Sequence, residues 1–169
     1  MAVIAQTDRM ILRSWRDDDA QPLAEMGSDA DFVRYLQGRP WTIEDALGMI
    51  STCREVEDLI GATLWALEDR KNGALVGYCG LGVTNASCLR ADLIELGWGI
   101  ERSLWGQGLA TEAATEVLAL GSRLFGSGRL VAKCHADNGP SERVMDHIGL
   151  RRAGPVLYLE CPTLIYRAT

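Results

Sequence analysis

The chain has 169 residues, 47% of them hydrophobic, a mean hydropathy near zero and a net charge of −6. This length is enough for one domain with a substantial core, and no run approaches the roughly 20 apolar residues that span a membrane. The acidic balance argues against a nucleic-acid surface, which needs clustered basic residues.

In the first third of the chain, the sequence pattern predicts one strand followed by three helices. Asp17 can cap the first helix, and Thr42 can cap the third, with Asp45 three residues further on. The predicted bounds are a strand over 10–14 and helices over 18–26, 32–36 and 42–56.

Acidic residues gather at 17–19 and 55–58. Such runs are usually solvated helix faces. The alternative is an acidic rim that raises the local concentration of a cationic amine substrate.

The rest of the chain alternates between strand and helix patterns. Asn72-Gly73 is a strong hairpin signal between the first two of these strands, and Gly149 can cap the last helix. A loop is expected over 85–90. We predict strands over 61–68, 74–83, 93–100, 129–135, 151–157 and 164–168, and helices over 110–126 and 138–147. The order predicts an α+β fold with a mixed, mostly antiparallel central sheet of about seven strands flanked by helices.

Five cysteines, an odd number, are widely spaced and form no C-x-x-C motif; they are Cys53, Cys79, Cys88, Cys134 and Cys161. This pattern predicts neither a disulfide framework nor a zinc site. The N-terminus has no basic segment followed by a long apolar run, so we expect a reducing, cytoplasmic location.

The most informative segment is the glycine loop, residues 105–110. Gly106, Gly108 and Ala110 leave the backbone bare between a predicted strand and a predicted helix. Free N–H groups and the positive end of the helix dipole then meet at one place, which suits a phosphate or pyrophosphate. There is no Gly-Lys-Ser/Thr and no G-x-G-x-x-G, so neither a P-loop nor a dinucleotide fingerprint is indicated. The alternative is a turn whose glycines only allow close packing.

Trp105 to Ala110 resembles the R/Q-x-x-G-x-G/A element of the GCN5-related N-acetyltransferase (GNAT) superfamily, with Trp105 in place of Arg or Gln. The form W-G-x-G-x-A-T-E-A is similar to the RimJ/RimL-like branch, which acetylates N-termini of ribosomal proteins. The resemblance implies one GNAT domain over 1–169 and acyl-CoA held by the loop and by the strand before it. The implied contacts are Trp98, Gly99, Ile100, Trp105, Gly106, Gln107, Gly108, Leu109, Ala110 and Thr111.

A second segment, from Asn138 to Leu150, resembles the superfamily's N-x-x-[AS]-x-x-x-[YLM]-x-x-x-G-[FL] element. The resemblance implies that Asn138 bonds the pantetheine arm. Many members have a Tyr at position 145 as general acid to the thiolate, but Met145 cannot give a proton. Ser141 is the candidate replacement. The alternative is that Asn138 or Ser141 is a helix N-cap.

Glu95 is the candidate general base, because it is a lone carboxylate in an apolar strand and shares a face with Gly97 and Gly99. These glycines would let pantetheine approach, or would only allow close strand packing. The alternative for Glu95 is an edge position or an ion pair. Cys134 is a weaker candidate nucleophile, because its neighbour His135 points to the opposite face of the strand.

The resemblance implies an N-acetyltransferase that moves an acetyl group from acetyl-CoA to a primary amine by direct attack, without a metal. The acceptor is open between a protein N-terminus and a small-molecule amine, and a homodimer is also open. Alternatives are a succinyl-CoA-dependent transferase and a non-catalytic acyl-CoA-binding module.

Overall fold

The computed structural model describes residues 2–36, 38–83, 92–158 and 161–169; the expected loop over 85–90 and Cys88 lie outside these ranges. The described residues form four α-helices, three short 3-10 helices (Asp17–Asp19, Arg102–Leu104 and Ser127–Arg129) and eight strands. The α-helices are α1 (Ala20–Gly27), α2 (Ile43–Ile60), α3 (Leu109–Phe125) and α4 (Gly139–His147). The strands are β1 (Val3–Gln6), β2 (Met10–Arg13), β3 (Leu64–Asp69), β4 (Leu75–Val83), β5 (Ile94–Ile100), β6 (Leu130–His135), β7 (Arg151–Tyr158) and β8 (Cys161–Arg167).

The strands form one mixed sheet in the order β1-β2-β3-β4-β5-β6-β8-β7. Every neighbouring pair is antiparallel except β5 and β6, which are parallel. The predicted α+β class and mostly antiparallel sheet are confirmed. The additional strand is β1, a four-residue edge strand paired with β2. A segment of four residues is too short to show a clear alternation of apolar and polar positions in the sequence.

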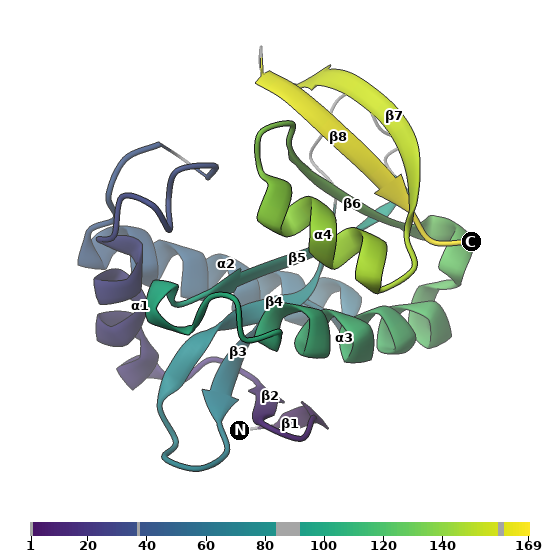
Figure 1. Ribbon diagram of the computed structural model, residues 1–169. Coiled ribbons are helices and arrows are strands. Elements are labelled where there is room, and N and C mark those ends of the chain that lie inside the picture. Colours follow the sequence, from purple (N-terminus) through teal and green to yellow (C-terminus); the bar gives the residue numbers. More distant parts are fainter. Residues whose placement is uncertain (1, 37, 84–91, 159–160) are drawn as a thin grey trace.

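Helices cover both faces of this sheet (Figure 1): α3 and α4 lie in front of it and α2 lies behind it. Between the sheet and α3 and α4 is a core that includes Leu81, Leu96, Ala113, Val117 and Met145. Between the sheet and α1 and α2 is a second core, with Trp15, Leu23, Val33 and Ile50 among its members. The apolar faces of the predicted helices therefore pack where their periodicity places them.

The start of α2 is confirmed in detail. Thr42 accepts a hydrogen bond from the Asp45 N–H at 3.3 Å, and the Asp45 carboxylate accepts one from the Thr42 N–H at 2.8 Å, which is a capping box. The helix continues past the predicted end at 56, until Gly61 adopts a left-handed conformation with φ 71°.

The predicted helix over 32–36 is wrong, because the chain there forms successive turns. The Asp29 carboxylate accepts hydrogen bonds from the N–H groups of Asp31 and Phe32, at 2.8 and 3.3 Å. This side-chain bonding competes with a helical hydrogen-bond pattern that a five-residue segment supports only weakly.

The acidic run at 17–19 is also not a uniformly solvated face. Asp19 is buried and receives two hydrogen bonds of 2.7 Å from the guanidinium of Arg13. Asp17 is exposed and pairs with Arg54 at 2.8 Å. The run therefore joins β2 to the start of α1 through one buried ion pair, and only part of it faces solvent.

Candidate functional site

The sheet opens between its two parallel strands. β5 and β6 pair only at Ile94–Leu130 and Glu95–Val131, although β5 continues to Ile100 and β6 to His135. Beyond these two pairs the strands part, so the edge of β5 that faces β6 has no strand partner there. An extended ligand can pair with backbone groups at such an edge.

A cavity of about 1060 Å³ occupies this region. It is lined by the end of β5, the glycine loop, the first turn of α3, one face of α4 and the segment 31–36. Of the predicted contacts, the cavity brings together Trp98, Gly99, Ile100, Trp105, Gly106, Gly108, Leu109, Ala110, Thr111, Asn138 and Ser141. Glu95 and Gln107 are not in its lining.

The glycine loop presents uncapped backbone to this cavity. Gly106 and Gly108 have φ values of 76° and 77°, in the left-handed region that glycine adopts without strain. Gly108 is the N-cap of α3 and provides no side-chain acceptor, so the first N–H groups of the helix lack a capping partner. A Cβ on Gly106 would meet no atom within 4 Å. The loop therefore has the geometry of an anion site at a helix N-terminus.

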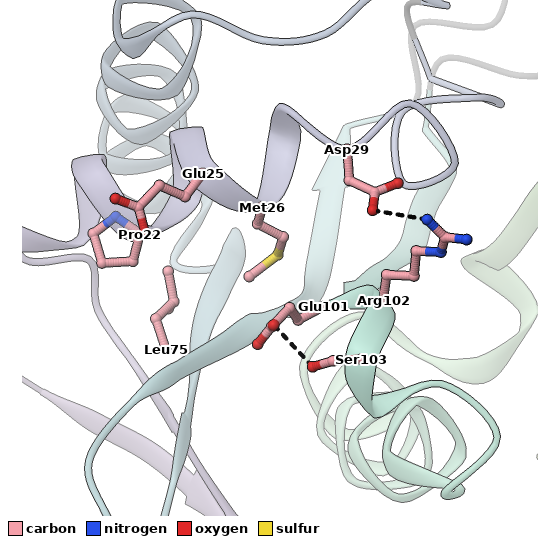
Figure 2. A pocket seen from close by; sticks show the side chains of 8 residues that line it. All are labelled: Pro22, Glu25, Met26, Asp29, Leu75, Glu101, Arg102 and Ser103. Carbon is pink, nitrogen blue, oxygen red and sulfur yellow. Dashed lines mark hydrogen bonds and ion pairs between the residues drawn. The ribbon is translucent and has the colours of Figure 1, made fainter.

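Trp105 and Arg102 hold the chain that leads into this loop. The indole of Trp105 donates a 2.6 Å hydrogen bond to the carbonyl oxygen of Ile100, which ties the loop to the end of β5. Figure 2 shows a second, smaller cavity beside the short 3-10 helix Arg102–Leu104, where Arg102 pairs with Asp29 at 3.2 Å. Arg102 also pairs with Asp31 at 2.9 Å, so this turn is joined to the segment that borders the main cavity.

The residues of α4 divide between the cavity and the core. Asn138 is the N-cap, since its side chain accepts a 3.2 Å hydrogen bond from the Ser141 N–H. Ser141 therefore stands in the first turn, lines the cavity and is not the cap. Met145 is buried in the core between the sheet and α3 and α4. Asn138 and Ser141, the two residues of α4 with a predicted function, therefore both line the cavity. Asn138 is also the N-cap of the helix, and Ser141 is not.

Glu95 lies on the opposite face of β5 from the core residues Ile94 and Leu96. Its carboxylate accepts hydrogen bonds of 2.6 and 2.5 Å from the ammonium of Lys133 on β6. The structure thus shows the ion pair that is the alternative to catalysis. The role of Glu95 as general base stays a prediction.

The two glycines on the same face as Glu95 make room for protein side chains. A Cβ on Gly99 would lie 2.7 Å from Cζ of Tyr78, and one on Gly97 would lie 3.3 Å from Cδ2 of Leu64. Side chains of β3 and β4 therefore fill the space above these glycines, as in the packing alternative. What β5 offers a ligand is its unpaired backbone edge.

The structure argues against a nucleophilic Cys134. The thiol is buried, and burial raises its pKa to about 11, so it carries little thiolate near neutral pH. Burial raises the pKa of the Cys79 thiol as well. Among the cysteines that the structure describes, Cys161 is exposed.

The sequence did not point to several residues that line the cavity. The segment 31–36 contributes Phe32 and Tyr35. The Tyr35 ring stacks on the His135 ring, with ring centroids 5.4 Å apart, and the Tyr35 hydroxyl donates a 3.1 Å hydrogen bond to the carbonyl oxygen of Asp137. Tyr78 enters from β4, and nothing local marks it. One signal was readable: Pro140, Arg143, Val144 and His147 recur at helical spacing on α4 and line the cavity together.

Neither a membrane helix nor a metal centre is found in the described ranges. None of the helices there combines the length and apolar character that a membrane crossing needs. The same ranges contain no group of three or more His, Cys, Asp or Glu side chains placed to hold a metal ion.

Comparison with known proteins agrees with this geometry. Residues 9–151 match the family model of the acetyltransferase (GNAT) domain. The chain is 30% identical over 156 residues to the uncharacterized N-acetyltransferase YoaA of Bacillus subtilis (strain 168), covering 91% of this chain and 86% of that protein.

Two solved structures show the same fold. A putative GnaT-family acetyltransferase from Bordetella pertussis superposes with a TM-score of 0.86 at 23% identity, with full coverage of both chains. The ribosomal L7/L12 α-N-protein acetyltransferase RimL, in complex with coenzyme A, superposes with a TM-score of 0.80 at 14% identity, covering 98% of this chain and 96% of that one. The chain belongs to the GNAT acetyltransferase family and is an acyl-CoA-dependent acetyltransferase.

Proposed function

We propose that this protein transfers the acetyl group of acetyl-CoA to a primary amine by direct attack of the amine on the thioester. The observation that carries the proposal is one cavity of about 1060 Å³ that is lined both by the uncapped N-terminus of α3 and by the end of β5, whose edge toward β6 is unpaired there. The N-terminus suits a pyrophosphate and the strand edge suits an amide-containing arm. Together they fit the two parts of coenzyme A.

The pyrophosphate would bind the N–H groups of the glycine loop and the first turn of α3. Pantetheine would then run along Trp98–Ile100 toward the gap between β5 and β6, with Asn138 on its other side. Arg34 and Arg143 also border the cavity and add positive charge for an anionic cosubstrate. In this placement the part of the cavity that the segment 31–36 lines stays open for the amine acceptor.

Chemistry at this site needs a proton acceptor for the ammonium and a proton donor for the departing thiolate. We assign the donor to Ser141, since it lines the cavity and is free of the capping role. Glu95 is the proposed base and would act through water, because its carboxylate is partly exposed but is not in the cavity lining. The burial and raised pKa of Cys134 support direct attack over an acyl-cysteine intermediate.

The acceptor is proposed to be a protein N-terminus or a small-molecule amine. The W-G-x-G-x-A-T-E-A form of residues 105–113 supports a place near the RimJ/RimL-like branch, and the cysteine pattern supports a cytoplasmic location. Two proposals compete with acetyl transfer: a succinyl-CoA-dependent transferase, which succinyl-CoA should stabilise more than acetyl-CoA does, and a non-catalytic acyl-CoA-binding module, which should release no thiol from acetyl-CoA with any amine.

Two measurements test this proposal. Thermal unfolding is followed with acetyl-CoA, succinyl-CoA, coenzyme A and ATP; a ligand at 100 times its Kd adds about 2.7 kcal/mol of stability. We expect acetyl-CoA and coenzyme A to stabilise the protein and ATP to have no effect. Intact-protein mass is then measured after incubation with acetyl-CoA alone. Direct attack predicts an unchanged mass, and a stable acetylated protein that passes its acetyl group to an amine would contradict it.

A further inference from the structure

The turn between β1 and β2 reaches the glycine loop through one residue, Arg9. Its Nη1 donates a 2.8 Å hydrogen bond to the carbonyl oxygen of Gln107. Its Nε and Nη2 each lie 2.6 Å from Oε2 of Glu112, and its backbone N–H donates to Oε1 at 2.9 Å. A residue near the N-terminus therefore contacts both the loop and the first turns of α3.

The contact with Gln107 fixes the orientation of one peptide group in the loop. In a trans peptide the C=O and the next N–H point in opposite directions. When the Gln107 carbonyl is bonded to Arg9, the Gly108 N–H must point away from Arg9, which is itself not in the lining of the cavity. Gln107, whose carbonyl oxygen is turned to Arg9, is the one predicted loop contact outside the cavity lining.

The contact with Glu112 removes a charge that would oppose an anion. Glu112 lines the cavity within the first turns of α3, where an unpaired carboxylate would repel a pyrophosphate. Burial alone would raise the pKa of Glu112, but hydrogen bonds from Thr7 and Arg9 outweigh it and hold that pKa below its usual value. The carboxylate is thus ionised at neutral pH, and Arg9 supplies its counter-charge.

We propose that Arg9 is a positioning residue for the pyrophosphate of the acyl-CoA cosubstrate: it aims the Gly108 N–H at the diphosphate and neutralises Glu112 beside it. The inference rests on the proposed placement of acyl-CoA in this cleft. It predicts that Arg9 matters for ligands that carry the diphosphate and is irrelevant to ligands that end at pantetheine.

The chain offers a matched control for this idea. Arg70 donates hydrogen bonds to the carbonyl oxygens of Thr7 and Asp8, at 2.8 and 3.1 Å, so it holds the same turn without contacting the glycine loop or Glu112. Arg9→Met and Arg70→Met each remove one positive charge and one set of donors from this turn while keeping an aliphatic stem.

The experiment measures the Kd of coenzyme A and of pantetheine by calorimetry for the wild type and both variants. Because Arg9→Met removes the charge-assisted contacts with Gln107 and Glu112, we expect it to raise the Kd of coenzyme A about tenfold. The Kd of pantetheine should stay unchanged in the same variant, which also shows that its cleft is intact. Arg70→Met should behave as wild type with both ligands.

Three results would overturn the role of Arg9: an unchanged Kd for coenzyme A in Arg9→Met, an equal rise for both ligands, or the same selective loss in Arg70→Met. A different result would overturn the proposed cofactor placement itself. In that case the wild type would bind pantetheine as tightly as coenzyme A, which means that the diphosphate makes no contact with the loop.

Discussion

Replacing Gly108 with alanine separates backbone strain from loss of the anion site. Gly108 has φ 77° and ψ 7°, and a Cβ there would lie 3.7 Å from Arg9 Nη2, so the new methyl group meets no steric clash within the protein. The left-handed conformation costs a non-glycine residue about 1–2 kcal/mol. At about 2–4 °C per kcal/mol for a chain of this size, the Tm should fall by about 2–8 °C.

The effect on the cosubstrate should be larger than this strain. The new Cβ would lie on the Arg9 side of the loop, outside the cavity lining, so it acts through the backbone: relaxation of the φ of 77° at the N-cap of α3 would turn the loop N–H groups away from a phosphate. The loss of one or two charge-assisted hydrogen bonds, about 2.8 kcal/mol together, corresponds to about a hundredfold weaker binding of coenzyme A.

Gly61 provides the control for this variant. It has φ 71° and ψ 15° at the C-terminus of α2, no atom lies within 4 Å of its Cβ position, and it is not in the cavity lining. Gly61→Ala should therefore lower the Tm by a similar amount and leave the affinity for coenzyme A unchanged, as measured by calorimetry. Equal affinity for coenzyme A in the two folded variants would refute the assignment of the glycine loop.

Three further predictions concern the chemistry of the site. Ser141→Ala should lower the single-turnover rate without lowering cofactor affinity or Tm, because Asn138 caps the helix; full activity would show that the thiolate takes its proton elsewhere. Glu95→Gln should cut turnover by about 100-fold while the Kd of acetyl-CoA stays constant, and wild-type turnover with a lower Tm would mean that Glu95 serves only its ion pair with Lys133. Because burial raises the pKa of Cys134 to about 11, its thiol stays protonated at pH 8 and should resist iodoacetamide in peptide mapping, and rapid labelling there would contradict its burial.

The order of elements was readable from the sequence because most segments are long and strongly periodic. The helix behind the glycine loop and the strand before it were predicted to within one residue at most ends, since their apolar spacing and glycines agree with the fold. The helix predicted over 32–36 was wrong because the Asp29 side chain and the burial of Phe32 set the conformation there, and local periodicity reports neither of them.

The candidate site was predicted where one continuous stretch of chain forms it, as in the glycine loop and the start of α4. It was missed where residues distant in sequence meet. Arg9 contacts the loop from 98 positions away in the sequence, and Tyr35, which lines the cavity, stacks on His135, 100 positions further along the chain. The packing of Tyr78 over Gly99 is of the same kind, because strand register decides which side chain fills the space above a glycine.

The most direct test of acetyl transfer is a panel of amines assayed for release of the coenzyme A thiol from acetyl-CoA, with the acetylated product identified by mass spectrometry. The panel contains peptides with free N-termini, polyamines and aminoglycosides, with N-terminally blocked peptides as the matched control. We expect at least one primary amine to give stoichiometric thiol and acetylated amine, and Gly108→Ala to lose this activity at low acetyl-CoA concentration. A protein that binds acetyl-CoA tightly but releases no thiol with any amine would contradict the account and would identify an acyl-CoA-binding module.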